Sequence, residues 1–243
     1  MPESGAVLVL TAHPDDETFR CGGLLALLAD RGARVHVLAA TRGEGGSCGD
    51  PPLCTREELG IMREEELRCA CLALGIEPPR FLDYRDETLA TVDEAQAVDR
   101  VLAVMRDISP EALITWPPDG LSGHPDHVAV SRWATLAFER AAAEGWTAPL
   151  ALYHLAVPRS VAGRLGMAQL YAIPDAEIDV TVDVSAVWEH KMAAIRCHRT
   201  QAGESPILRA PMERQRLFLG IEHLTRAAAR CGDDVVRRLH HQG

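Results

Sequence analysis

Lysine is almost absent from this sequence. Lys191 is the only one among 25 lysine and arginine residues, and no run of basic residues occurs. The formal net charge is -10 at pH 7, and an acidic chain repels a phosphate backbone, which argues against a nucleic-acid partner. Hydrophobic residues make up 47% of the 243 positions, so the chain has enough apolar material for a sizeable core.

Long hydrophobic runs are absent too. The apolar stretch Ala6–Ala12 is shorter than the hydrophobic region of a signal peptide, and no basic segment precedes it. No run approaches the roughly 18 residues that a membrane-spanning helix needs. We therefore expect a cytoplasmic protein without a membrane partner.

The seven cysteines include no CxxC pair, which excludes a zinc ribbon and a thioredoxin-like redox site. Cys69 and Cys71 lie in a helical pattern and are predicted to be free thiols in the core or at the surface. Cys48 and Cys54 share one loop and could pair if oxidised. Because cytoplasmic disulfides are rare, we expect both to stay reduced.

Short apolar runs alternate with longer amphipathic segments along the first 150 or so residues. The predicted strands are Ala6–Ala12, Arg34–Thr41, Arg80–Tyr84, Ala112–Trp116 and Ala151–Val157. The predicted helices are Phe19–Arg31, Thr55–Leu74, Val92–Asp107 and Asp126–Ala143. Repeated strand–helix units with short connections predict an α/β fold with a mostly parallel sheet and helices on both faces. Further on, Ile178–Val184 is a predicted edge strand and Val187–His198 a predicted helix.

A first polar cluster, His13, Asp15 and Asp16, follows the first predicted strand directly. Imidazole and carboxylate are good zinc ligands, and a tight turn could bring His13 and Asp16 onto one ion. Asp15 would then point elsewhere and be free to accept a proton. The alternative is that both carboxylates only cap the following helix, and this segment alone leaves the two interpretations open.

A second cluster, His124, Asp126 and His127, follows the fourth strand and opens another helix. Because ligands of parallel sheets bind beyond the carboxyl ends of the strands, the two clusters are expected to meet. A catalytic zinc has three protein ligands and one water, which leaves residues over for acid–base work. The spacing does not decide which of the two histidines binds metal, and a solvated capping loop is the alternative.

The glycine-rich loop Gly43–Pro52 does not fit a phosphate cradle. It has neither GxGxxG nor GxxxxGK[ST], and it follows the second strand rather than the first. A dinucleotide-binding oxidoreductase needs a glycine fingerprint after the first strand, where HPDD stands instead.

The two clusters carry specific motifs, AHPDDE at Ala12–Glu17 and HPDH at His124–His127. With them the sequence resembles the LmbE-like family, also called the PIG-L N-acetylglucosaminyl deacetylases. Weaker matches extend over most of the chain, at Thr41–Gly46, Arg63–Gly75, Tyr84–Asp86 and Lys191–Gln201. The resemblance implies a Rossmann-like fold that binds one zinc ion.

The resemblance also implies roles for single residues. The metal ligands of the family correspond to His13, Asp16 and His127. Asp15 corresponds to the general base. The remaining implied positions are His124 as oxyanion stabiliser or acid, Asp126 as the residue that holds this imidazole, and Arg63 and Asp86 as contacts to sugar or phosphate groups.

We therefore predict a zinc-dependent hydrolase that removes the acetyl group from an N-acetylglucosamine-type substrate. Iron(II) would also suit these ligands. An amidase for a larger acyl group on a thiol-sugar conjugate is the nearest alternative, and a non-catalytic metal- or sugar-binding protein is a further one. One domain is expected over residues 1–243, with a core of about 5–157 and a variable part of about 158–243. The family suggests a homo-oligomer.

Overall fold

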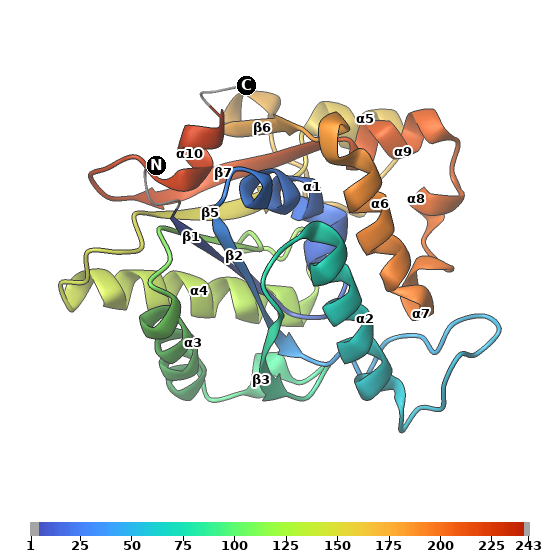
Figure 1. The fold of residues 1–243 in the computed structure, drawn as a ribbon, viewed down its shortest axis with the longest axis horizontal. Coiled ribbons are helices and arrows are strands. Elements are labelled where there is room, and N and C mark those ends of the chain that lie inside the picture. Colours follow the sequence, from blue (N-terminus) through green and yellow to red (C-terminus); the bar gives the residue numbers. More distant parts are fainter. Residues whose placement is uncertain (1–4, 241–243) are drawn as a thin grey trace.

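The computed structural model describes residues 5–240, and they form a seven-stranded sheet covered by helices on both faces (Figure 1). The strands are β1 (Ala6–Thr11), β2 (Arg34–Thr41), β3 (Arg80–Tyr84), β4 (Ala112–Thr115), β5 (Ala151–Ala156), β6 (Val180–Asp183) and β7 (Ile221–Ala229). The helices are α1 (Asp16–Asp30), α2 (Leu59–Leu74), α3 (Glu94–Ile108), α4 (Pro125–Ala143), α5 (Arg159–Leu165), α6 (Trp188–Cys197), α7 (Arg199–Ala202), α8 (Pro206–Arg209), α9 (Met212–Leu219) and α10 (Val235–His240).

The strand order is β3-β2-β1-β4-β5-β7-β6. Strands β1 to β5 pair in parallel, whereas β7 runs antiparallel to both β5 and β6. The predicted α/β fold with a mostly parallel sheet is thereby confirmed, and β6 lies at the predicted edge. No helix within residues 5–240 is long and apolar enough to cross a membrane.

The central strands are apolar along their length because helices cover both faces of the sheet. Every residue of β1 is buried, and so is every residue of β2 after the first. Helices α3 and α4 pack together on one face, and α1, α2 and α6 pack together on the other (Figure 1). A strand buried on both sides reads as a continuous apolar run, which is why these strands were predictable.

The largest error in the predicted bounds is the start of α2. The prediction began this helix at Thr55, whereas the helix begins at Leu59. A contact of the kind that caps helices does form at Thr55, since its amide and its hydroxyl both lie 3.0 Å from Glu58 Oε2. It closes a turn that precedes the helix instead of its first turn.

A buried ion pair ties the C-terminal strands to α1. Lys191 of α6 donates to Glu222 Oε1 of β7 at 2.6 Å, and neither side chain is more than 2% exposed. Glu222 also accepts the backbone amides of Gly23 and Leu24 in the middle of α1. Lys191 donates in addition to the carbonyl of Leu219. The only lysine of the chain is therefore an internal link of the fold.

A disulfide joins α2 to α6, which the sequence did not predict. Cys69 and Cys197 are bonded, with their Cα atoms 5.7 Å apart, so the prediction of a free thiol at Cys69 was wrong. The prediction holds for Cys71, which is a buried free thiol, and Cys48 and Cys54 are also free. Spacing along one chain cannot reveal a pair that is 128 residues apart.

Loss of this disulfide is expected to lower the free energy of unfolding by about 2–4 kcal/mol, because the bond constrains a long loop of the unfolded chain. The double variant Cys69→Ser/Cys197→Ser and the reduced wild-type protein should give the same value in urea unfolding. Cys48→Ser, which removes a free thiol, is the control and should change little. A reductant that leaves the wild-type transition unmoved would contradict this prediction.

Candidate metal centre and active site

The two predicted polar clusters meet where the strand order of the sheet reverses. The first cluster lies between β1 and α1, and the second lies between β4 and α4. Strands β1 and β4 are direct neighbours, and the chain leaves them toward helices on opposite faces. This switch point is the usual ligand-binding crevice of such sheets, because the carboxyl ends of both strands open into it.

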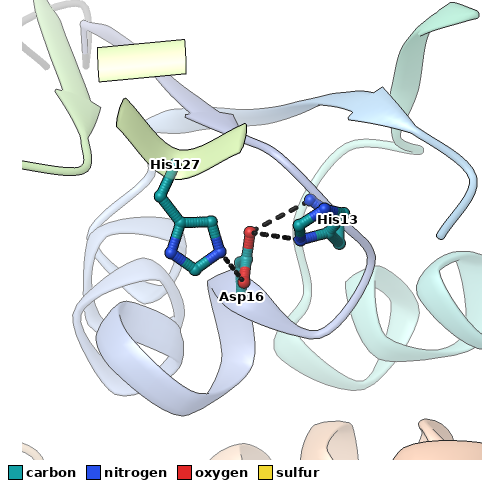
Figure 2. A group of neighbouring side chains, drawn as sticks. All are labelled: His13, Asp16 and His127. Atoms are coloured by element: carbon teal, nitrogen blue, oxygen red, sulfur yellow. Dashed lines mark hydrogen bonds and ion pairs between the residues drawn. The ribbon is translucent and has the colours of Figure 1, made fainter. Parts of the chain in front are cut away.

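His13, Asp16 and His127 form a compact group of possible metal ligands (Figure 2). Each offers one ligand atom, and these atoms all lie within 4.8 Å of one another. Asp16 lies between the two rings, with Oδ1 at 3.5 Å from His127 Nε2 and Oδ2 at 3.9 Å from His13 Nδ1. The three residues thus converge from two separate loops.

Hydrogen bonds on the far side of each ring orient the two histidines. His13 Nε2 lies 2.8 Å from Asp86 Oδ1, and His127 Nδ1 lies 3.2 Å from the carbonyl of Gly120. When each ring is neutral and donates through this nitrogen, His13 Nδ1 and His127 Nε2 carry the lone pairs on the side of Asp16; metal binding requires this neutral form. Metal-binding histidines usually have such an outer partner. Two imidazoles and one carboxylate oriented in this way fit a divalent zinc-type ion.

Asp16 is held in place by groups other than the two histidines. Its Oδ2 accepts the amides of Ala12 and His13 and the indole Nε1–H of Trp116. Burial raises the pKa of Asp16, but the charges and hydrogen bonds of His127 and His13 lower it well below its usual range. Trp116 is buried and stacks on His127 at 4.0 Å, so it supports two of the three candidate ligands.

Three carboxylates, those of Asp16, Asp86 and Asp126, lie within 4 Å of the His13 ring nitrogens. Burial alone would lower the pKa of His13, but hydrogen bonds to Asp126 and Asp86 and the charge of Asp16 raise the pKa to about 10. The same contact acts on the pKa of Asp86. Burial raises this pKa, but the hydrogen bond to His13 lowers it to about 2. The site therefore stabilises positive charge at its centre.

Asp15 stands outside the ligand group and does not cap α1. It occupies the N-cap position with a φ of 103°, yet its side chain makes no capping hydrogen bond. Its carboxylate is partly exposed and lies 3.3 Å from Arg63 Nη2. Burial raises the pKa of Asp15 to about 6, against the opposing charge of Arg63. The capping interpretation therefore does not apply to this residue.

His124 lies beside both ring ligands, 5.1 Å from His13 and 4.7 Å from His127 between ring centroids. Its Nδ1 accepts the amide of Asp126 at 3.2 Å, so a neutral His124 carries its proton on Nε2. Burial and the charges of His127 and His13 lower the pKa of His124. A lower pKa favours the neutral ring, in which Nε2–H can donate a hydrogen bond.

The structure gives Asp126 different contacts from those predicted. Its carboxylate accepts the amides of Glu87 and Leu89 and lies 3.3 Å from His13 Nε2. Only its backbone amide bonds to the His124 ring. Asp126 therefore joins the segment after β3 to His13, one of the candidate metal ligands, and its orienting role toward His124 stays a prediction.

The two predicted substrate contacts also bind protein groups. Buried Arg63 donates to the carbonyls of Gly43 and Pro14 as well as to Asp15. Asp86 accepts the amide of Gly45 at 2.9 Å besides contacting His13. Both residues thus fix the walls of the site, and their contact with a sugar remains a prediction.

Gly120 was missed at the sequence level although its surroundings require glycine. Its φ is +66°, and a Cβ there would lie 2.9 Å from His127 Cβ. The neighbouring Leu121 also has a positive φ, of 66°, which is rare for such a side chain. The turn Pro117-Pro118-Asp119-Gly120 was the available signal, since such clusters mark tight turns.

A polar cavity of about 440 Å³ lies beside the candidate metal centre. It shares Asp86 with the centre, and its lining residues are Glu44, Gly45, Arg56, Glu57, Arg85, Asp86 and Glu87. These residues come from the glycine-rich loop, the approach to α2 and the segment after β3. Glu44 of the glycine-rich loop therefore lines a cavity next to the candidate centre.

Comparison with known proteins shows to which family the chain belongs. Residues 8–138 match the family model PIG-L, described as GlcNAc-PI de-N-acetylase. The chain belongs to the PIG-L family. A Mycobacterium sp. (strain JLS) protein named 1D-myo-inositol 2-acetamido-2-deoxy-alpha-D-glucopyranoside deacetylase is 34% identical to this PIG-L protein over 234 residues, covering 82% of this chain and 75% of that protein.

One further relative and one solved structure are also similar to this PIG-L protein. A Bacillus cereus protein, named probable N-acetyl-alpha-D-glucosaminyl L-malate deacetylase 2, is 33% identical over 196 residues, with 80% and 83% of the two chains covered. The crystal structure of the 4-carboxy-2-hydroxymuconate hydratase from Pseudomonas putida KT2440 aligns with a TM-score of 0.70 at 23% identity, over 95% of this chain and 99% of that one. The hydratase shares the fold alone, so the reaction has to be argued from the site.

Proposed function

We propose that this PIG-L protein is a zinc-dependent N-deacetylase that hydrolyses the acetamide of an N-acetylglucosamine-type substrate. One observation carries the proposal: His13, Asp16 and His127 converge at the switch point, with Asp15 and His124 beside them but outside that group. The relatives named for deacetylation of glucosaminyl conjugates support the substrate class.

In this proposal His13, Asp16 and His127 hold the metal. A bound zinc ion supplies Lewis acidity and brings the pKa of water to around 7. Imidazole and carboxylate donors also accept iron(II), so the metal itself has to be measured. The outer contacts with Asp86 and Gly120 keep both imidazoles aimed at Asp16 before any metal binds.

Asp15 carries the proton transfer, and His124 stabilises the charge that develops on the carbonyl oxygen. Asp15 accepts the proton of the water that attacks the acetamide carbonyl, because its carboxylate is outside the ligand group and partly exposed, and it then passes this proton to the leaving nitrogen. His124 donates a hydrogen bond from Nε2 to the developing oxyanion and keeps its proton, since Nδ1 accepts the Asp126 amide. The products are acetate and the free amine of the sugar.

The same proposal includes the domain organisation and the partner. Strands β6 and β7 share one sheet with β1 to β5, which supports a single domain in which the C-terminal part completes the core. The polar cavity next to Asp86 supports a small hydrophilic sugar conjugate as the partner. An aglycone such as inositol or malate would be accommodated there.

Removal of metal from the purified protein is expected to abolish acetate release, and zinc is expected to restore it. The substrates to compare are N-acetylglucosamine, chitooligosaccharides, an N-acetylglucosaminyl inositol and an N-acetylglucosaminyl malate, with a butyryl amide as the larger-acyl case. Free amine and metal content are measured on the same samples. A protein that holds its metal and releases amine only from the butyryl amide would contradict the deacetylase and support the larger-acyl amidase.

His127→Ala is expected to weaken zinc binding by roughly 100-fold or more, since even the outer partners of metal ligands are worth about 10- to 100-fold. His190→Ala, at an exposed position of α6, is the matched control and should keep its zinc. Zinc content equal to that of the wild type in His127→Ala would exclude this residue from the ligand set.

A further inference from the structure

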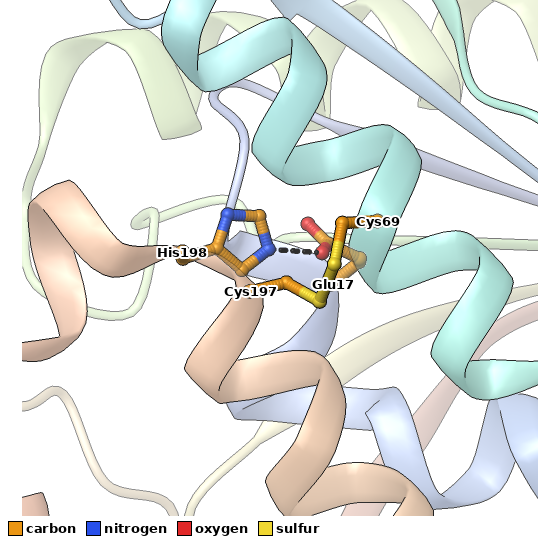
Figure 3. The surroundings of a disulfide bond; sticks show 4 residues. All are labelled: Glu17, Cys69, Cys197 and His198. Atoms are coloured by element: carbon orange, nitrogen blue, oxygen red, sulfur yellow. Dashed lines mark hydrogen bonds and ion pairs between the residues drawn. A yellow bond between two sulfur atoms is a disulfide. The ribbon is translucent and has the colours of Figure 1, made fainter.

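A second buried ion pair lies behind the candidate active site. His198, directly after α6, places Nε2 at 2.9 Å from Oε1 of Glu17, in the first turn of α1 (Figure 3). Both side chains are fully buried. His198 Nδ1 has no hydrogen-bond partner among residues 5–240, so the contact with Glu17 is what orients the ring. A buried charged pair is costly to assemble, which calls for a role.

The other oxygen of Glu17 contacts the backbone of Asp15. Glu17 Oε2 accepts the Asp15 amide at 3.0 Å, and the hydroxyl of Thr18 donates to the Asp15 carbonyl at 2.9 Å. Asp15 has a φ of 103°, a conformation that is rare and unfavourable for a non-glycine residue. Such a conformation persists only where neighbouring groups hold it, and Glu17 is one of those groups.

His198 is itself fixed from both sides. The preceding residue, Cys197, is bonded to Cys69 of α2 (Figure 3). Two residues after it, Thr200 donates its amide and its hydroxyl to buried Glu66 of α2, at 2.9 and 2.7 Å. The imidazole therefore projects toward α1 from a segment that α2 holds on either side.

We propose that Glu17 and His198 are positioning residues for Asp15. The imidazole of His198 holds the Glu17 carboxylate, and this carboxylate holds the Asp15 backbone in the left-handed conformation that turns its side chain into the site. The inference rests on the proposed role of Asp15 as the proton acceptor. Arg63 contacts the Asp15 side chain, whereas Glu17 and His198 act on its backbone.

The test compares two substitutions of one residue. His198→Gln keeps an N–H donor at about the position of Nε2, whereas His198→Leu removes it. His198→Leu is expected to lower kcat by roughly 10- to 100-fold, because small misplacements of a catalytic group have effects of this size. KM and zinc content should stay unchanged. His198→Gln should restore most of the lost kcat.

Thr200→Val is the matched control, since it removes a buried contact of the same segment without touching Glu17. It should lower the melting temperature while kcat stays close to the wild-type value. If kcat falls in both variants in step with the melting temperature, His198 has only a structural role and the proposal is overturned. His198→Gln, which preserves the hydrogen bond, keeps the comparison informative even if His198→Leu folds poorly.

Hydrogen exchange of the Asp15 amide gives a readout that does not depend on activity. The amide should be protected in the wild type and in His198→Gln, and it should exchange faster in His198→Leu. Unchanged exchange in His198→Leu would overturn the proposal whatever the rates are. Faster exchange supports it even if the wild type releases no acetate from any substrate, a result that would count against the proposed deacetylase instead.

Discussion

Asp15→Asn is expected to lower kcat by roughly 100- to 10,000-fold, the usual contribution of a general base. Asparagine has nearly the same shape but cannot accept the proton of the attacking water. Metal should remain bound, because Asp15 is outside the group formed by His13, Asp16 and His127. Rates of acetate release and zinc content, measured on the same preparation, check both parts of this expectation.

Asp107→Asn is the matched control for this substitution. It makes the same chemical change in an exposed ion pair with Arg80, and its activity should equal that of the wild type. Asp15→Asn protein that binds zinc and turns over at the wild-type rate would exclude Asp15 as the base. Loss of zinc from it would instead place Asp15 among the ligands.

Lys191→Met is expected to destabilise the protein by about 3–5 kcal/mol, because it leaves the buried Glu222 carboxylate without its counter-charge. Burial lowers the pKa of Lys191, while the contact with Glu222 opposes this change. Urea unfolding monitored by circular dichroism gives the difference in free energy, provided that the slope with denaturant stays constant.

Two further variants separate the charge from the packing. In Lys191→Met/Glu222→Gln the uncompensated charge is gone, and part of the lost stability should return. Arg140→Met, which breaks exposed ion pairs with Asp99 and Glu144, should change the stability far less, because solvent screens such pairs. An equal loss of unfolding free energy in Lys191→Met and Arg140→Met would show that the buried ion pair contributes no more to stability than an exposed one.

Local patterns were sufficient to predict the parallel half of the sheet. β1, β4 and β5 were predicted within one residue and β2 with its observed bounds, because strands buried on both faces are largely apolar. β3, a partly exposed edge strand, was also predicted with its observed bounds. Strand β7 could not be found in this way. It contains Glu222, and a glutamate in a sequence normally indicates a surface position. Only the three-dimensional structure shows that Lys191 lies opposite Glu222 and allows its burial.

The motifs predicted the six central polar residues but not the contacts that orient them. That Asp86 and Asp126 both contact His13 depends on how the segment after β3 and the start of α4 lie against the loop after β1, which no local pattern encodes. The same holds for Glu17 and His198, which are 181 residues apart. Sequence spacing identifies groups on one turn, whereas these contacts are set by the tertiary fold.

The complete burial of Lys191 has a consequence for chemical probes of this molecule. The surface carries no lysine ammonium group, so acylating dyes, amine cross-linkers and activated supports meet no lysine side chain while the fold is intact. Acylation of Lys191 requires that α6 and β7 separate. The rate of this acylation therefore measures how often this part of the core opens. Mass spectrometry can follow it at Lys191 without an engineered label.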